Sequence, residues 1–275
     1  MKPLIDCDVL RYEIGFSGQF KNEEGEIIVR PFEFVAELFD EKIRQICDAV
    51  WATEPPTLYL TGKGNFRDKI ATLKPYKGTR KVDKPFHFKN LTAYIKAHYD
   101  VIEAQGMEAD DLLCVEQTKR LKHLDTIICT RDKDLRQCPG MHYGWECGAQ
   151  AGFGPKRVTE IGEINPHFKL DKVTGKEVLY KVSGDGLKFF YAQVIMGDGV
   201  DNIPGLQGAG PAFTYNLLEG CNTEEELFNA VLGAYTNKYG DLARERMLEQ
   251  AQLCWMVREL DEEGQPVMWR MLDES

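Results

Sequence analysis

The stretch Asp125-Thr-Ile-Ile-Cys-Thr130 is a largely apolar run, and Arg131-Asp-Lys-Asp134 follows it directly. A short apolar run that ends in polar residues predicts a buried strand. Four other runs in the first half of the chain have this character: residues 4–5, 57–60, 99–102 and 142–145. Helical spacing of apolar residues fills residues 32–50 and, more weakly, 112–121, whereas a polar turn is expected after residue 5. This alternation predicts an α/β fold with a mostly parallel sheet.

The pattern changes in the second half of the chain. Residues 167–182 have the sequence of a two-stranded hairpin that turns near Thr174-Gly175. Helical patterns follow over residues 187–196, 211–218, 224–235 and 242–258. We therefore expect an α/β domain over residues 1–183 and a helical region over residues 184–275.

Composition narrows the class of protein. The 275 residues are 43% hydrophobic and 28% charged, which is typical of a globular protein and excludes a disordered or fibrous one. No run of 18 apolar residues occurs, so we expect no membrane partner. The eight cysteines are scattered without a CxxC pair, which favours a reducing, cytoplasmic location and gives no support to a zinc site.

The net charge of −10 is unevenly distributed. Residues 63–100 hold ten Lys and Arg against three Asp, whereas residues 219–275 are strongly acidic. Exposed charges more than about 10 Å apart are largely screened in salt, so a local basic stretch can bind a polyanion on an acidic protein. A solvated loop explains the charge alone equally well.

Acidic residues gather where four expected elements end or begin. They are Asp6 and Asp8; Glu108, Asp110 and Asp111; Asp132 and Asp134; and Asp198 and Asp201. Each group alone has an ordinary explanation as a helix cap or a turn. If they converge, carboxylates about 5 Å apart repel by roughly 3 kcal/mol and need cations between them. Oxygen ligands favour Mg²⁺ or Mn²⁺, which predicts a two-metal site for phosphodiester hydrolysis.

A glycine-rich segment follows the last acidic pair. Gly205, Gly208 and Gly210 precede a predicted helix, so backbone amides and the helix N-terminus can approach a phosphate closely. A tight connection between two helices is the alternative explanation.

Together these motifs resemble the flap endonuclease/5′→3′ exonuclease family, particularly its stand-alone bacteriophage members. The resemblance covers residues 4–218. The motifs that carry it are Leu4-Ile-Asp-Cys-Asp8, Gly64-Asn-Phe-Arg67, Tyr76-Lys-Gly-Thr-Arg80, Gly106-Met-Glu-Ala-Asp-Asp111, Thr130-Arg-Asp-Lys-Asp-Leu135, and Gly197-Asp-Gly-Val-Asp-Asn-Ile-Pro-Gly205 with Gly208-Ala-Gly210.

The resemblance implies a PIN-like core followed by a helix–three-turn–helix region. It implies two divalent cations, Mg²⁺ or Mn²⁺, on Asp6, Glu108, Asp110, Asp111, Asp132, Asp134, Asp198 and Asp201, with Asp8 as a further candidate. The implied catalytic residues are Lys77, Arg80 and Asp132. The implied DNA-binding residues are Arg67, Tyr76, Lys77, Arg80, Lys81, Lys84, Gly205, Gly208 and Gly210, with Tyr76 stacking on a terminal base.

The implied activity is hydrolysis of phosphodiesters at or near 5′ ends, as a 5′→3′ exonuclease or flap endonuclease. The implied partners are double-stranded DNA with 5′ ends, nicks or flaps, and RNA–DNA hybrids. K⁺ is a further candidate at the glycine-rich segment. We expect a monomer, in the host cytoplasm if the protein is encoded by a phage.

Two departures from the family pattern bear on function. Many relatives have an aspartate just after the second strand, where this chain reads Leu60-Thr-Gly-Lys63. Only 25 residues, including Pro85, separate Arg80 from Gly106. We therefore expect an open or half-closed arch in which Lys81, Lys84 and Lys89 line a groove.

Two other functions remain open at this point. Asp6-Cys-Asp8 and Gly197-Asp-Gly-Val-Asp201 are similar to motifs of haloacid-dehalogenase-like phosphatases, although Leu10 departs from that pattern. A non-catalytic module that binds DNA structures is the other alternative.

Overall fold

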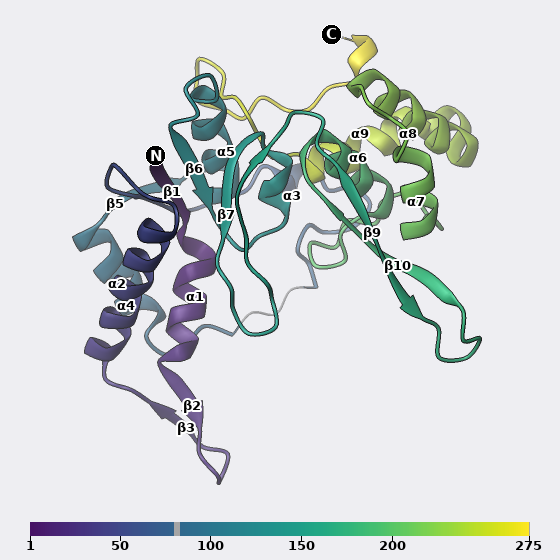
Figure 1. Ribbon diagram of the computed structural model, residues 1–275. Helices are drawn as coiled ribbons and strands as arrows, with labels where there is room; N and C mark the ends of the chain where they lie inside the picture. The colour runs from purple at the N-terminus through teal and green to yellow at the C-terminus, as the bar shows by residue number, and fades with distance from the viewer. Residues whose placement is uncertain (80–82, 275) are drawn as a thin grey trace. The chain divides into compact units, whose positions relative to one another are not determined.

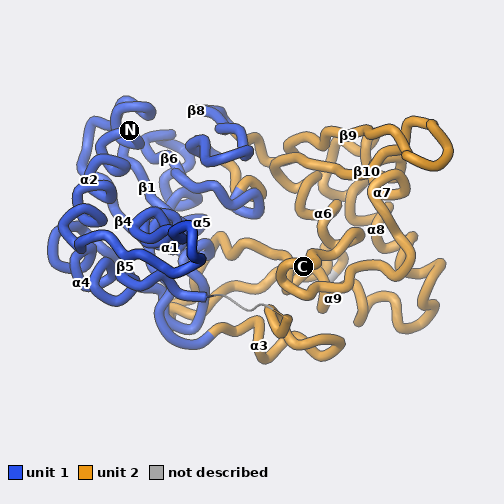
Figure 2. The backbone as a smooth tube through the Cα atoms, turned by 90° about the horizontal axis from the view of Figure 1, so that it is seen from below, with its two compact units in different colours: residues 1–64, 81–135, 140–157 blue, residues 65–80, 136–139, 158–275 orange. Residues whose placement is uncertain are grey.

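The computed structural model describes residues 1–79 and 83–274. Contacts divide the chain into two compact units, shown in different colours in Figure 2. Unit 1 holds residues 1–64, 81–135 and 140–157, and unit 2 holds residues 65–80, 136–139 and 158–275. The contacts group residues 158–183 with the helical part of the chain; the domain boundary near residue 183 stays a prediction.

Unit 1 is built on a six-stranded sheet (Figure 1). Its strand order is β5 (Asp100–Ala104), β4 (Thr57–Thr61), β1 (Lys2–Asp6), β6 (Thr126–Cys129), β7 (Gly140–Gly144) and β8 (Phe153–Val158). Every pair from β5 to β7 is parallel, with Ile5 opposite both Leu58 and Cys129. The predicted α/β fold with a mostly parallel sheet is confirmed.

Helices cover this sheet. The buried side chains of Ile5, Leu58 and Cys129 form one core with α1 (Cys7–Ser17), α2 (Phe32–Ala49) and α4 (Phe88–His98). Helix α5 (Ala109–Lys119) contacts β1, β4 and β6. A small hairpin of β2 (Gln19–Lys21) and β3 (Ile27–Val29) follows α1.

Two helices of unit 1 differ from the sequence-based expectation. Where a polar turn was expected after the first strand, α1 begins at Cys7, because the Asp6 side chain accepts the backbone N–H groups of Asp8 and Val9 and caps the helix. Helix α4 follows Pro85 and buries Leu91 and Ile95 completely in the core. The segment that contains Lys89 is therefore a helix whose apolar side packs in the core, while Lys89 itself is exposed; its place along a groove stays a prediction.

Unit 2 is mainly helical. Its main helices are α6 (Gly186–Met196), α7 (Pro211–Leu218), α8 (Glu224–Tyr239) and α9 (Ala243–Cys254), with a short α3 (Arg67–Ile70) and one-turn helices at Gly240–Leu242 and Leu272–Glu274. Their core includes the fully buried Phe190, Tyr191 and Tyr235. The predicted hairpin is confirmed as β9 (Ile164–Leu170) and β10 (Glu177–Gly184). A further one-turn helix, Asp134–Gln137, follows the loop after β6. None of the helices in the described residues is long and apolar enough to cross a membrane.

Candidate metal and phosphate site

Asp6 lies at the carboxyl end of β1 and is almost completely buried. One carboxylate oxygen, Oδ1, accepts the N–H groups of Asp8 (3.0 Å) and Val9 (3.2 Å) at the start of α1. The other, Oδ2, accepts a 2.7 Å hydrogen bond from the Thr130 hydroxyl. The helix and the loop after β6 thus fix this carboxylate from both sides.

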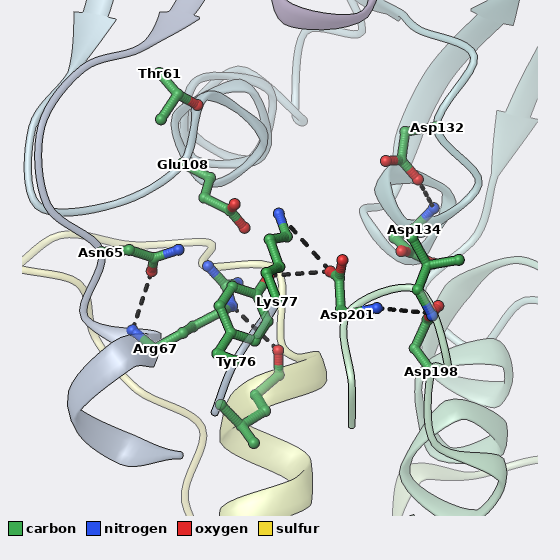
Figure 3. Close-up of polar contacts among 12 residues, drawn as sticks. Thr61, Asn65, Arg67, Tyr76, Lys77, Glu108, Asp132, Asp134, Asp198 and Asp201 are labelled. Carbon is green, nitrogen blue, oxygen red and sulfur yellow. Dashed lines mark hydrogen bonds and ion pairs between the residues drawn. The ribbon is translucent and has the colours of Figure 1, made fainter. Parts of the chain in front are cut away.

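Asp132 lies in the loop that follows β6. Its backbone N–H donates to Thr130 Oγ1 (2.9 Å), and its Oδ1 accepts the N–H of Asp134 (2.9 Å; Figure 3). The Thr130 hydroxyl therefore donates to one acidic residue and accepts from the next. Because β1 and β6 are parallel neighbours, their carboxyl ends lie at the same edge of the sheet.

Burial and the neighbouring acids raise the pKa values of these two carboxyls. Burial raises the pKa of Asp6 to about 6, and the negative charge of Asp8 adds to this effect. Burial raises the pKa of Asp132 to about 7, with further contributions from the charges of Asp134 and Asp6. Buried carboxylates that repel each other are stabilised by a cation, and a set of oxygen donors suits Mg²⁺ or Mn²⁺. The residues present fit a divalent cation.

Thr61 connects a second part of the site. It is the last residue of β4, the second strand predicted from the sequence, and stands in the segment for which the family resemblance implies an aspartate. Its backbone N–H donates to Asp8 Oδ2 (2.9 Å), and its hydroxyl accepts the N–H of Ala109 (2.9 Å), the first residue of α5. The other oxygen of Asp8 pairs with Arg11 at 2.7 Å. Thr61 and Thr130 were not among the expected site residues, although both are hydroxyl residues directly at the ends of predicted strands.

The acidic group at the start of α5 forms a capping box. The Glu108 side chain accepts the N–H of Asp111, and Asp111 Oδ2 accepts the N–H of Glu108 at 3.2 Å. Asp110 lies between them in the first turn, and Asp111 is fully buried. The helix-cap explanation therefore holds for Glu108 and Asp111, and the capping contacts also fix the positions of these two carboxylates.

The predicted metal ligands are divided between the two units. Six of them belong to unit 1: Asp6, Glu108, Asp110, Asp111, Asp132 and Asp134. Asp198 and Asp201 belong to unit 2. Across residues 1–79 and 83–274, no three His, Cys, Asp or Glu side chains form a group that could by itself hold a metal ion. The full ligand set remains a prediction.

In unit 2, Asp198 and Asp201 shape the turn after α6. Asp198 Oδ1 accepts the N–H groups of Val200 (2.7 Å) and Asp201 (3.3 Å). Asp201 in turn binds the basic stretch of the same unit, as Figure 3 shows. Its Oδ2 accepts the Tyr76 hydroxyl (3.0 Å) and lies 3.8 Å from Lys77 Nζ, and its carbonyl accepts the Lys77 N–H (2.9 Å).

Two predicted DNA contacts need correction. Arg67 has an exposed fraction of 0%, and its guanidinium donates to the carbonyls of Leu253 (3.1 Å) and Trp255 (2.5 Å) at the end of α9. Tyr76 is 8% exposed and belongs to the core of unit 2. The Arg67 guanidinium is hydrogen-bonded to carbonyls at the end of α9, and the Tyr76 hydroxyl is hydrogen-bonded to Asp201. Neither side chain is therefore exposed for contact with a phosphate or a base. Lys84 is exposed, whereas Arg80 and Lys81 lie outside the described residues.

The glycine-rich segment divides into a packed part and an open part. The N–H of Gly205 donates to Gln250 Oε1 (2.9 Å), and a Cβ there would lie 2.4 Å from the nitrogen of Gly197. The absence of a side chain at Gly205 thus allows the close backbone contact in the connection between α6 and α7. A Cβ at Gly208 or Gly210 would meet nothing within 4 Å. A cavity of about 270 Å³ beside Gly208 is lined also by Phe213 and Lys238.

Sequence comparison finds similar segments in larger proteins. No family model matches the chain. DNA polymerase I of Lactococcus lactis subsp. lactis (strain IL1403) is 22% identical over 233 residues, which cover 81% of this chain and 24% of that protein. DNA polymerase I of Borreliella burgdorferi is 31% identical over 138 residues, which cover 49% of this chain and 13% of the relative. The chain thus spans a quarter or less of the length of these relatives.

A solved structure matches almost the whole length of the chain. A structure of T5 5′-exonuclease with divalent zinc ions bound is 16% identical, and the match covers 92% of this chain and 99% of that one with a TM-score of 0.50. The chain therefore has the PIN-like fold of T5 5′-exonuclease, and the resemblance that its motifs bear to the flap endonuclease/5′→3′ exonuclease family is confirmed at the level of the fold.

Proposed function

We propose that this chain is a divalent-metal-dependent 5′ nuclease that hydrolyses phosphodiesters at or near the 5′ ends of DNA. The observation that carries the proposal is the pair of carboxyls of the buried Asp6 and the half-buried Asp132, joined through the Thr130 hydroxyl at the carboxyl edge of the sheet. T5 5′-exonuclease, which shares this fold, has been solved with divalent zinc ions bound.

The proposed roles of the residues rest on their chemistry and on the contacts within each unit. When bound, two divalent cations such as Mg²⁺ or Mn²⁺ supply Lewis acidity toward the attacking water and the leaving 3′ oxygen. Asp6 and Asp132 would hold cations, together with Asp134 and the acidic residues at the start of α5. Asp198 and Asp201, which belong to unit 2, stay candidate ligands on the ground of the family resemblance.

Binding of the substrate is assigned to basic residues and to open backbone. Lys77 and Lys84, with Arg80 and Lys81, would orient the scissile strand through its phosphates, a contact that positions DNA without reading its sequence. Gly208 and Gly210 would contact a duplex phosphate, with K⁺ as a candidate ion there. The proposed substrates are nicked, flapped or blunt duplexes and RNA–DNA hybrids, bound by a monomer.

The phosphatase alternative is disfavoured by two observations. The oxygens of Asp8 are engaged by the Thr61 N–H and by Arg11, so this residue is poorly placed to act as a general acid. The segment Gly197-Asp-Gly-Val-Asp201 follows helix α6, and it therefore does not occupy the end of a sheet strand.

A cleavage assay with matched variants tests the proposal. The substrates are 5′-labelled nicked and 5′-flap duplexes with Mg²⁺, and the variants are Asp132→Asn and the exposed control Asp241→Asn. We expect Asp132→Asn to lower kcat at least about 100-fold while duplex binding in Ca²⁺ stays within about threefold, and the control to behave as wild type. Full activity in EDTA would contradict the proposal. Binding without cleavage would favour the non-catalytic module, and release of terminal phosphate alone would favour the phosphatase.

A further inference from the structure

We propose that Glu13 is a positioning residue for Asp132 and acts through Arg131. The inference rests on the proposed function, and all the residues involved belong to unit 1. Glu13 lies on α1, and its Oε2 accepts a 2.7 Å hydrogen bond from Arg131 Nη1. The two side chains are only 13% and 17% exposed, so this ion pair is largely shielded from water.

Glu13 is itself held by other elements. The indole N–H of Trp145, just after β7, donates to the same Oε2 at 2.9 Å. Lys42 of α2 places its Nζ 3.9 Å from Oε1. A carboxylate bound by donors from three segments has little freedom to move, so it is a fixed anchor for Arg131.

Gln150 holds Arg131 from its other side. Its Oε1 accepts a 2.6 Å hydrogen bond from Arg131 Nη2, and its Nε2 donates to the Arg131 carbonyl at 3.0 Å. Gln150 thus binds both the head group and the main chain of one residue. Together with Glu13, it fixes the backbone between Thr130 and Asp132.

The neighbours of Arg131 explain what this anchoring does. Thr130 donates to Asp6, and Asp132 follows Arg131 directly, so any shift of Arg131 moves both carboxyl contacts of the site. Neither Glu13 nor Gln150 has to touch a cation for this effect. Residues that orient metal ligands from outside typically change metal affinity or activity by about 10–100-fold when they are removed.

The test measures Mn²⁺ binding and catalysis together. Glu13→Ala should raise the Kd for Mn²⁺, measured from the free-ion signal in electron paramagnetic resonance, by about tenfold. It should also lower kcat, while KM for nicked duplex stays within about twofold because the basic residues are untouched. Glu13→Gln, which keeps an oxygen acceptor, should recover most of both. Gln150→Ala should change the Kd in the same direction as Glu13→Ala.

Two controls separate positioning from mere stabilisation. Glu41→Ala removes a different glutamate, the exposed partner of Arg44 on α2, and should leave Kd and kcat unchanged. In an Asp132→Asn background, Glu13→Ala should change the Kd for Mn²⁺ by less than about threefold, since the larger part of the effect passes through Asp132 and only the Thr130–Asp6 contact is left to transmit it.

Several outcomes would overturn the inference. The first is a Glu13→Ala variant with a lowered midpoint of unfolding but wild-type Kd and kcat. The second is a further tenfold change in the Kd for Mn²⁺ when Glu13→Ala is added to Asp132→Asn. The third is that the wild type does not bind Mn²⁺. If the wild type binds Mn²⁺ and shows the coupling but cleaves no DNA, the nuclease proposal fails and the positioning role stands.

Discussion

The hydroxyl of Thr130 donates a 2.7 Å hydrogen bond to the carboxylate of Asp6, a residue 124 positions earlier in the chain. The same oxygen accepts the backbone N–H of Asp132. A single hydroxyl therefore links the buried Asp6, at the end of β1, with the half-buried Asp132, in the loop after the neighbouring parallel strand β6. This link lowers the pKa of Asp6, opposing the larger effect of burial.

Replacing Thr130 should change the pH dependence of cleavage. Thr130→Val removes the donor to Asp6 and so raises the pKa of that carboxyl further. The acidic limb of the kcat–pH profile should move up by about one pH unit, because a hydrogen bond to a charged group contributes about 1.5–3 kcal/mol. Thr130→Ser keeps the hydroxyl and should retain the wild-type profile. Identical profiles for Val and Ser would show that the hydroxyl does not act on Asp6.

The raised pKa of Asp132 makes the metal-free protein sensitive to pH. The pKa is about 7 in the folded state against 3.8 ordinarily, so its favourable contribution to stability is present below about pH 4 and is lost as pH rises toward 7. Asp132→Asn should therefore raise the free energy of unfolding in EDTA at pH 8 by about 1–3 kcal/mol and have little effect at pH 4.

Urea denaturation at the two pH values measures this difference. Mg²⁺ should stabilise the wild type at pH 8 more than it stabilises Asp132→Asn, because only the wild type carries the full buried charge. An equal effect of the substitution at both pH values would mean that burial of the carboxylate is not its cause.

Substitutions of Arg67 and Lys77 should distinguish a structural role from a DNA-binding role within the basic stretch. Arg67→Met leaves the carbonyls of Leu253 and Trp255 without their buried donor and should cost about 2–4 kcal/mol of unfolding free energy. Lys77→Ala should weaken duplex binding alike for all sequences and make the slope of log K against log salt shallower by about one unit. A salt slope that changes for Arg67→Met would return that residue to the DNA-binding set.

The sequence predicted the alternation of strands and helices because apolar periodicity is local. Helix α7 begins and ends where it was expected, and the hairpin of β9 and β10 turns at the expected glycine. Helix α1 escaped prediction because its cap, Asp6, belongs to an acidic motif that also has a functional interpretation. The burial of Arg67 could not be predicted, since its partner Leu253 lies 186 residues away.

The last prediction concerns how a 5′ end reaches the site. Residues 65–79 belong to unit 2 and are held by its other segments: the N–H groups of Thr72 and Leu73 donate to Glu249 Oε1 at 2.9 Å each, and Asn202 Nδ2 donates to the Pro75 carbonyl. After Pro85 the chain enters α4, which belongs to the core of unit 1. The described residues before residue 80 and after residue 82 thus pack within their own units. They provide no pair of long helices that could close over a strand.

We therefore expect the enzyme to degrade 5′ ends at nicks and at blunt ends, and to cut a 5′ flap whose end is blocked by a bulky protein. The measurement uses a flap with a 5′ biotin to which streptavidin is bound before the enzyme is added, and the unblocked flap is the control. Because a groove admits the strand from the side, the block should lower the initial rate by no more than about threefold, a change that corresponds to less than 1 kcal/mol in the barrier. If streptavidin abolishes cleavage while the unblocked flap is cut efficiently, the strand must thread through a closed opening, and the expected open groove is wrong.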